Sequence, residues 1–235
     1  MKIIKKIIPK VGGALMTLFV ATSAQALVIF PTFTEVGVET GTAQSSTVLR
    51  ADLTLFPSLL EIGSITINDS GSGVGGSAGA YSGFDVDALF IDGDGDYATT
   101  GDQTYASSYV FNAGAIRAGS APASNTSGAL NGSNADGTVD EAFASLDAID
   151  AIFFSTGSIS LGDGGSLSAN FNPTVSVGSS LFLVVSEVGT ELGESVTGLI
   201  EVSDEPVSVP EPSSALLLGL GLLGFGYRRF SNRKS

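Results

Sequence analysis

Several short segments of the chain alternate between apolar and polar residues, which is the pattern of strands that bury one face. In residues 47–56 this alternation places Leu49, Ala51, Leu53 and Leu55 on one face. Glycine-, asparagine- and aspartate-rich turns separate the segments, so the chain is predicted to be all-β, an antiparallel β-sandwich or jelly roll. The other predicted strands cover residues 59–68, 83–92, 105–111, 149–156, 158–161, 166–171, 181–187 and 198–203.

The segment 83–92 combines apolar alternation with acidic residues. Its first predicted face consists of Phe84, Val86, Ala88 and Phe90. Asp85 and Asp87 lie opposite this face, whereas the later residues Leu89 and Ile91 make both faces apolar. This order predicts a strand that passes from the solvated margin of a sheet into its interior.

Between the predicted strands, the glycine- and serine-rich runs at 70–80 and 119–134 are expected to be long loops. One short helix of one or two turns is predicted after Thr138, because Glu141 stands at the third position of a capping box. Phe143 and Leu146 would share its apolar face.

Residues 1–26 have the three parts of a secretory signal peptide. Four lysines precede an apolar stretch over 11–21, and Ala24 and Ala26 form the A-x-A arrangement that signal peptidase recognises. The apolar stretch is much shorter than the roughly 20 residues of a membrane span. We therefore expect export, with cleavage after Ala26.

The charge of the chain is concentrated between residues 27 and 205. This segment holds 23 of the 24 acidic residues but only two of the ten basic ones, Arg50 and Arg117, for a formal charge of −21. Such a charge repels phosphates, so nucleic acid is excluded as a partner. Histidine and cysteine are absent, which excludes Ser-His-Asp and Cys-His catalysis, imidazole ligands for zinc, and disulfides. We expect no enzymatic activity.

The end of the chain has three parts. A linker rich in proline and acidic residues covers 204–212, 15 uncharged residues cover 213–227, and a basic tail covers 228–235. As a helix, the uncharged run would extend roughly 22 Å, which is short for a hydrocarbon core of roughly 30 Å. The pattern predicts a β-rich ectodomain over 27–203, a short transmembrane sorting helix, and a tail that stays cytoplasmic.

These features together resemble the PEP-CTERM sorting signal of Gram-negative bacteria. The resemblance rests on a Pro-Glu-Pro triplet, the short Leu/Gly run and a basic end. Its motif residues are Val209, Pro210, Glu211, Pro212, Arg228 and Arg229. It implies transient anchoring in the inner membrane, recognition and cleavage by an exosortase, and a final location at the cell surface or outside the cell. Hosts of such proteins usually make an exopolysaccharide. The resemblance leaves the ectodomain unassigned.

The densest acidic cluster lies in residues 85–102. Asp92, Asp94 and Asp96 alternate with glycines, a spacing that lets carboxylates converge on a hard cation such as Ca²⁺. The spacing resembles the first half of an EF-hand loop, but Tyr97 and Gln103 replace the glycine and the bidentate glutamate of its second half. A solvated acidic turn explains the same residues equally well. The wider cluster consists of Asp85, Asp87, Asp92, Asp94, Asp96 and Asp102.

Two further sets of residues are weaker candidates. An acidic set is formed by Asn134, Asp136, Asp140 and Glu141, but capping by Thr138 explains it as well. Four tyrosines that bracket the acidic cluster could stack on sugars or simply pack within the fold; they are Tyr81, Tyr97, Tyr105 and Tyr109.

The preferred hypothesis is an exported, non-enzymatic protein with a structural or adhesive role in the exopolysaccharide matrix or biofilm. Its predicted partners are the export machinery, signal peptidase, an exosortase-type enzyme and the exopolysaccharide. The alternatives are a calcium-dependent carbohydrate-binding module and a glycosidase that uses a pair of acids.

Overall fold

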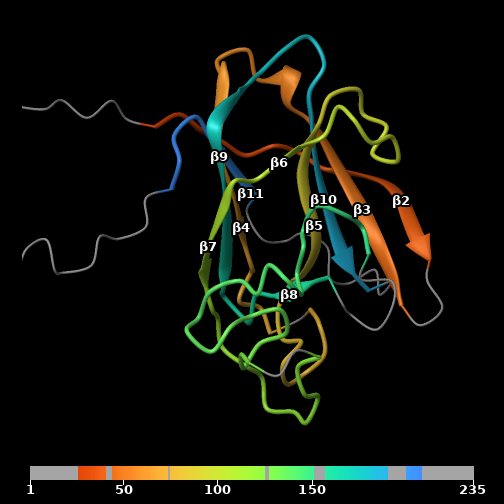
Figure 1. Cartoon of the computed structure of the whole chain (residues 1–235), viewed down its shortest axis with the longest axis vertical. Helices are drawn as coiled ribbons and strands as arrows, with labels where there is room; N and C mark the ends of the chain where they lie inside the picture. Colours follow the sequence, from red (N-terminus) through yellow and green to blue (C-terminus); the bar gives the residue numbers. More distant parts are fainter. Residues whose placement is uncertain are drawn as a thin grey trace, which may run out of the picture.

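Two antiparallel β-sheets pack face to face in the computed structural model, which describes residues 26–40, 44–73, 75–124, 127–150, 157–189 and 200–207 (Figure 1). One sheet has the order β1-β11-β4-β9-β7, with β1 (Val28–Ile29), β4 (Glu61–Asn68), β7 (Ser108–Asn112), β9 (Ser166–Ser176) and β11 (Ile200–Ser203). The other has the order β2-β3-β10-β5-β6, with β2 (Thr34–Thr40), β3 (Ser45–Asp52), β5 (Asp85–Asp92), β6 (Thr104–Tyr105) and β10 (Phe182–Val188), while β8 (Ile159–Ser160) also pairs with β5. The prediction of an all-β antiparallel fold is confirmed.

The main core lies between the two sheets. Ile65 and Leu167 of one sheet and Leu89 and Leu183 of the other belong to the same buried cluster, and all four are fully buried. Burying each such side chain contributes roughly 1.5–3 kcal/mol. Because alternate residues of the strands in both sheets point into this layer, the face-to-face packing removes these apolar side chains from water.

A second, smaller apolar cluster covers the outer face of the β3-β10-β5 sheet. Phe90 and Val184 are buried there, and Tyr97 and Ile149 pack against them from the loops. The strand β5 is thus buried on both faces, as its apolar run indicates. The loop segments that carry Tyr97 and Ile149 are held on this face, where the candidate site lies.

The faces of β5 differ from the prediction because the strand has a β-bulge at Asp87. Pairing with β10 passes from Val86 opposite Glu187 to Ala88 opposite Ser186, so Asp87 is the extra residue. Val86 therefore points into the main core, whereas Ala88 belongs to the outer cluster. The prediction that they share one face is wrong, because the extra residue reverses the alternation.

The predicted solvent exposure of the first acidic residues of β5 is also wrong. Asp85 is 6% exposed and Asp87 is fully buried. One oxygen of Asp87 accepts a hydrogen bond from the Asp150 backbone N–H at 3.1 Å, and the other accepts from the Ser186 hydroxyl at 3.2 Å. The carboxylate is buried because it bridges β5 to β10 and to the segment before residue 151.

Several predicted strand bounds change. Residues 105–111 divide between β6 and β7, which belong to different sheets, and β9 continues to Ser176. Within 47–56 the strand ends at Asp52 and a 3₁₀ turn, η1 (Leu53–Leu55), follows. Leu55 is 72% exposed, while Val48 on the predicted polar side is fully buried, so the predicted apolar face of this segment is only partly correct. The two-residue strand β1 and the seven-residue strand β2 were not predicted.

The region after Thr138 forms turns and no helix. The backbone N–H groups of Phe143 and Ala144 both donate to the Asp140 carbonyl, at 2.9 and 2.7 Å. The Thr138 hydroxyl donates to Asp136 instead of capping the segment, so the predicted helix is wrong. The loops predicted at 70–80 and 119–134 contain none of the named strands and are confirmed for their described residues.

Some predictions fall outside the described residues: the signal peptide, most of the strand 149–156, the sorting helix over 213–227 and the tail over 228–235. Within the residues that are described, no helix has the length and apolarity that crossing a membrane requires.

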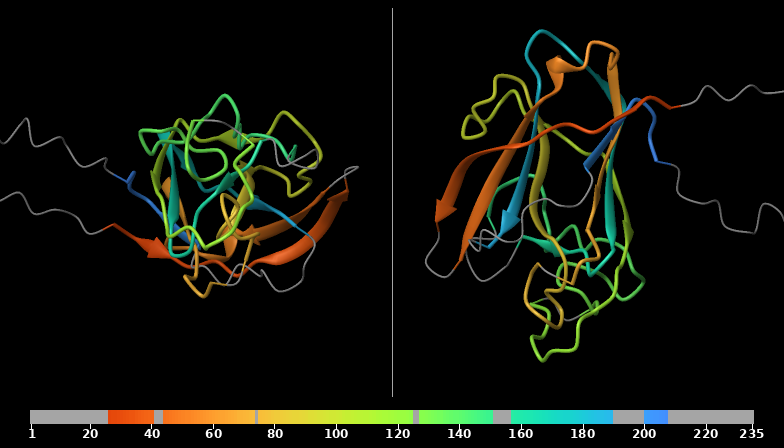
Figure 2. Two further views of the ribbon diagram at one scale, coloured as in Figure 1. Left: turned by 90° about the horizontal axis from the view of Figure 1, so that it is seen from below. Right: turned by 180° about the vertical axis from the view of Figure 1, so that it is seen from behind.

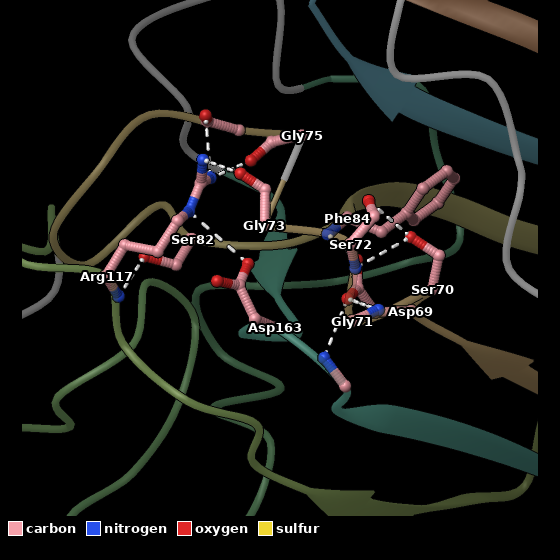
Figure 3. Close-up of polar contacts among 12 residues, drawn as sticks. Asp69, Ser70, Gly71, Ser72, Gly73, Gly75, Ser82, Phe84, Arg117 and Asp163 are labelled. Atoms are coloured by element: carbon pink, nitrogen blue, oxygen red, sulfur yellow. Dashed lines mark hydrogen bonds and ion pairs between the residues drawn. The ribbon is translucent and has the colours of Figure 1, made fainter.

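The two ends of the sandwich carry different loops (Figures 1 and 2). The loop between β5 and β6 stands at one end, and the glycine-rich loops that precede β5 and follow β7 gather at the other. At the glycine-rich end, Arg117 donates to the carbonyls of Gly73 and Gly76 at 3.0 and 2.9 Å and pairs with Asp163 (Figure 3). Arg117 thus holds a loop that has little side-chain packing of its own.

Asp69 supports the same end of the molecule. Its carboxylate accepts hydrogen bonds from the backbone N–H groups of Gly71, Gly164 and Phe84 at 2.8, 2.7 and 3.0 Å (Figure 3). These contacts join the end of β4 to the turn before β9 and to the start of β5. Arg117 and Asp69 therefore both support the glycine-rich end, with backbone groups as their main partners.

Candidate functional site

The loop between β5 and β6 is built from successive turns that aspartates close. Asp92 accepts hydrogen bonds from the backbone N–H groups of Asp94, at 3.2 Å, and Gly95. Asp94 accepts from Asp96 N–H at 2.8 Å, and Asp96 accepts from Ala98 N–H at 3.3 Å. Asp and Gly favour such turns because the short carboxylate reaches the backbone two residues on. The alternating Asp-Gly pattern thus determines the local path of the loop.

Arg50 of β3 supports this loop from the neighbouring strand. Its guanidinium donates to the carbonyl of Gly95 and lies 4.9 Å from the centroid of the Phe182 ring. Gly95 has φ +85°, and a Cβ added to it would meet the Phe182 ring at 2.9 Å and Arg50 at 3.0 Å. The position therefore requires glycine for both its backbone conformation and its close packing.

Three carboxylates of the loop come together. Asp92, Asp94 and Asp102 each place an oxygen within 4.8 Å of the others, and this is the one such group among the described residues. Asp96, which the sequence pattern places with Asp92 and Asp94, is not a member; Asp102 from the far end of the loop takes its place. Neither Asp85 nor Asp87 belongs to the group, and the weaker acidic set around Asp136 forms no such group.

Asp92 differs from its two partners in burial. It is fully buried, whereas Asp94 and Asp102 are exposed. Its Oδ2 atom is buried without a hydrogen-bond partner among the described residues. Burial raises the pKa of the Asp92 carboxyl, the backbone N–H of Gly95 lowers it, and repulsion from Asp102 raises it further. A buried carboxylate oxygen of this kind calls for a proton or a cation.

An open pocket of about 440 Å³ lies beside the same loop. Three strands and two loop segments line it, including Glu39 (β2), Phe90 (β5), Tyr97 and Gln103 (the β5–β6 loop), Tyr105 (β6) and Asp147. Its volume falls in the range of roughly 300–1,000 Å³ of small-molecule sites. No lining residue is basic, so the pocket suits neutral or cationic groups and disfavours anions.

Hydrogen bonds fix the aromatic side chains of the pocket. The Tyr97 hydroxyl donates to Glu39 at 3.0 Å, and Gln103 donates to the Tyr97 carbonyl at 3.0 Å while accepting from the Tyr105 hydroxyl. Phe90 meets Tyr105 edge to face, with ring centroids 6.0 Å apart. The pocket therefore presents positioned rings together with amide and carboxylate groups.

The two tyrosine hydroxyls stay protonated over the physiological range. Burial raises the pKa of Tyr97, and its hydrogen bond to Glu39 raises it further. Burial also raises the pKa of Tyr105, with an added effect from the charge of Asp147. Both hydroxyls can therefore act as hydrogen-bond donors at neutral pH.

The structure separates the four tyrosines of the sequence pattern. Tyr97 and Tyr105 line the pocket. Tyr81 hydrogen-bonds to Ser124 among the glycine-rich loops, and Tyr109 of β7 packs against the main core. Sequence reasoning did not select Glu39 or Asp147 for the site. No local signal marks them, because strand pairing and loop packing bring them to the pocket.

Comparison with known proteins identifies one segment of the chain. No curated protein and no solved structure matches the chain. Residues 208–229 match the family model of the PEP-CTERM protein-sorting motif, which implies an exported protein with a C-terminal sorting signal and processing by an exosortase-type enzyme. The resemblance inferred from Pro210–Glu211–Pro212 is thus confirmed, and the chain carries a PEP-CTERM sorting motif.

Proposed function

We propose that the β-sandwich is the ectodomain of an exosortase-processed protein that has a structural or adhesive role in an extracellular polysaccharide matrix. The sorting motif at residues 208–229 is the observation that carries this proposal. The matched residues include Arg228 and Arg229, two of the eight basic residues that lie outside the ectodomain. The role is non-enzymatic, and the described surface acts by binding.

The charge of the ectodomain limits which class of polysaccharide can be its partner. Residues 27–205 hold 23 acidic residues and two arginines, and Arg117 is already paired with Asp163. Long-range repulsion keeps such a body away from strongly anionic polymers and lipids at low ionic strength. A neutral or cationic polysaccharide is the matching partner.

The sorting part of the proposal is tested by the intact mass of the mature protein from its native host, combined with fractionation of cells, surface polysaccharide and medium. The expected protein lacks residues 1–26 and is cut near Pro210–Pro212, so that it also lacks residues 228–235, and it is recovered with the surface polysaccharide or the medium. A mature protein that retains Arg228 to Ser235 in the cell membrane would contradict the proposal.

A second candidate function, carbohydrate binding, is supported by the pocket beside Tyr97 and Tyr105. Sugar rings stack their apolar C–H faces on aromatic side chains, and their hydroxyls pair with carboxylates and amides. Tyr105 is 40% exposed, and Glu39, Gln103 and Asp147 lie around the same pocket. These groups make the pocket the best-supported place for a saccharide unit among the described residues.

Calorimetric titration of the detergent-solubilised full chain tests this function, with a neutral glucan oligosaccharide and a glucosamine oligosaccharide as probes. Tyr105→Ala is expected to weaken binding at least tenfold by removing a stacking face. Tyr81→Ala, at the opposite end of the sandwich, serves as the matched control and is expected to leave binding unchanged. The candidate fails if neither oligosaccharide binds or if both variants bind like the unmodified chain.

A further inference from the structure

The buried carboxylate of Asp92 is incompletely satisfied. Its Oδ1 atom accepts hydrogen bonds from the backbone N–H groups of Asp94 and Gly95. Its Oδ2 atom is buried and has no hydrogen-bond partner in the described part of the chain. A buried charged group is normally paired with an opposite charge or bound to a metal ion. Otherwise it loses its contacts with water and gains none in return, which costs free energy. Asp92 therefore needs a partner that the described side chains do not supply.

The two arginines of the ectodomain do not neutralise this site. Arg117 pairs with Asp163, which is the one ion pair among the described residues, and lies among the glycine-rich loops. Arg50 approaches the acidic loop but donates to the Gly95 carbonyl and stacks on Phe182. Asp94 and Asp102, the nearest carboxylates, add negative charge to Asp92. The missing partner must come from outside the described side chains.

We propose that Asp92, Asp94 and Asp102 bind one Ca²⁺ ion. All three offer hard oxygen ligands within 4.8 Å of one another, which is the chemistry that Ca²⁺ prefers. The exposed Asp94 and Asp102 leave room for the water molecules that would complete six to eight ligands. Extracellular calcium modules typically bind with dissociation constants of roughly 10⁻⁴–10⁻³ M, and a site of three carboxylates on an exported protein fits this range.

The ion would cross-link the two ends of the β5–β6 loop. Asp92 is the last residue of β5, and Asp102 lies two residues before β6. Asp102 lies close enough to Gly93 that a Cβ added there would meet its carboxylate at 3.1 Å, so the loop ends already touch. Between them lie Tyr97, Ala98 and Thr100, which line the pocket. The bound ion would therefore fix one wall of the pocket, a role independent of the sorting proposal.

Titration of the detergent-solubilised full chain with CaCl₂ after chelation tests the site. One binding event is expected, with a rise in Tm of roughly 5–10 °C at a free Ca²⁺ concentration a hundred times the dissociation constant. Tb³⁺ substituted for Ca²⁺ is expected to luminesce on tyrosine excitation, because Tyr97 lies in the same loop and the chain has no tryptophan. Absence of heat, of a Tm shift and of Tb³⁺ luminescence at millimolar metal would overturn the proposal.

A matched pair of variants separates this set of ligands from the one that the sequence pattern suggests. Asp102→Asn is expected to weaken Ca²⁺ binding at least tenfold, whereas Asp96→Asn, in the same loop and also exposed, is expected to change the dissociation constant by no more than about threefold. Both residues are exposed, so neither substitution disturbs the core. Equal loss in both variants, or unchanged binding in Asp102→Asn, would contradict the proposed ligands. The test needs no saccharide, so its outcome is independent of the proposed function.

Discussion

The guanidinium Nε of Arg117 lies 3.3 Å from a carboxylate oxygen of Asp163. The same guanidinium donates to the carbonyls of Gly73, Gly75 and Gly76, so one side chain holds both an acidic partner and a glycine-rich loop. Its side chain is 24% exposed, and that of Asp163 is 15% exposed. Arg117 is one of only two basic residues in the segment 27–205, and its role is to hold this loop in place.

Arg117→Lys is expected to destabilise the protein by about 1–3 kcal/mol, because an ammonium cannot reproduce the planar fork that reaches several carbonyls. Urea unfolding of the full chain measures the loss. Asp163→Asn, which removes only the ion pair, is expected to cost less than Arg117→Lys. If Asp163→Asn proves the more damaging change, the ion pair and not the carbonyl contacts holds the loop.

Gly37→Ala is expected to displace the hydroxyl of Tyr97 from the pocket. A Cβ at position 37 would collide with that hydroxyl, which is held by Glu39. Overpacking of this kind typically costs about 1–3 kcal/mol. Urea unfolding and the NMR signals of the Tyr97 ring report the change. Gly178→Ala is the control, because the nearest atom to its added Cβ is 4.0 Å away; equal effects of the two substitutions would contradict the crowding.

Alkaline solution is expected to destabilise the protein through Tyr109. Burial first, and the charges of Glu141 and Asp147 second, raise the pKa of its hydroxyl to about 12, whereas an unfolded tyrosine has a pKa of about 10. The stability that the neutral hydroxyl contributes is complete below pH 10 and is lost as the pH rises through 12. The loss is at most about 2.7 kcal/mol, less where solvent screens the group.

Tyr109→Phe tests this linkage, because it keeps the ring and removes the ionisable hydroxyl. Urea unfolding at a series of pH values from 8 to 12 should show similar stabilities near pH 8 and a growing advantage of the variant above pH 10. If the free energy of unfolding depends on pH in the same way for both proteins, the ionisation of Tyr109 does not destabilise the folded state.

Replacing Pro210, Glu211 and Pro212 together by alanine is expected to leave the sorting signal unprocessed in the native host. The two prolines restrict the backbone around a single acidic side chain, and alanine removes both features. The intact mass is expected to retain residues 228–235. Pro206→Ala, in the same linker but outside the matched residues 208–229, is the control and should be processed normally.

The predictability of the strands varies with their dependence on distant residues. The segments 59–68 and 181–187 coincide closely with β4 and β10, because alternation of side chains is a local property of an extended backbone. The faces of β5 could not be predicted, since the bulge at Asp87 arises from its pairing with β10. The division of 105–111 between two sheets likewise depends on where the partner strands lie.

The candidate site shows the same division. Asp92 and Asp94 could be selected from their spacing, because neighbouring residues of one turn stay close in any fold. Asp102 replaces Asp96 in the observed carboxylate group only because the loop returns to its own start. Glu39 reaches the pocket through the pairing of β2 with β3, and no feature near residue 39 announces this.

By itself, the sequence determined the β-rich class, the concentration of negative charge, the acidic turn and the PEP-CTERM sorting motif. Each of these depends on composition or on residues close together in the chain. Only the tertiary structure decided which carboxylates meet, which tyrosines share a pocket, and that Asp85 and Asp87 are buried. These relationships depend on strand register and loop closure, and both are set by contacts between segments that lie far apart in the sequence.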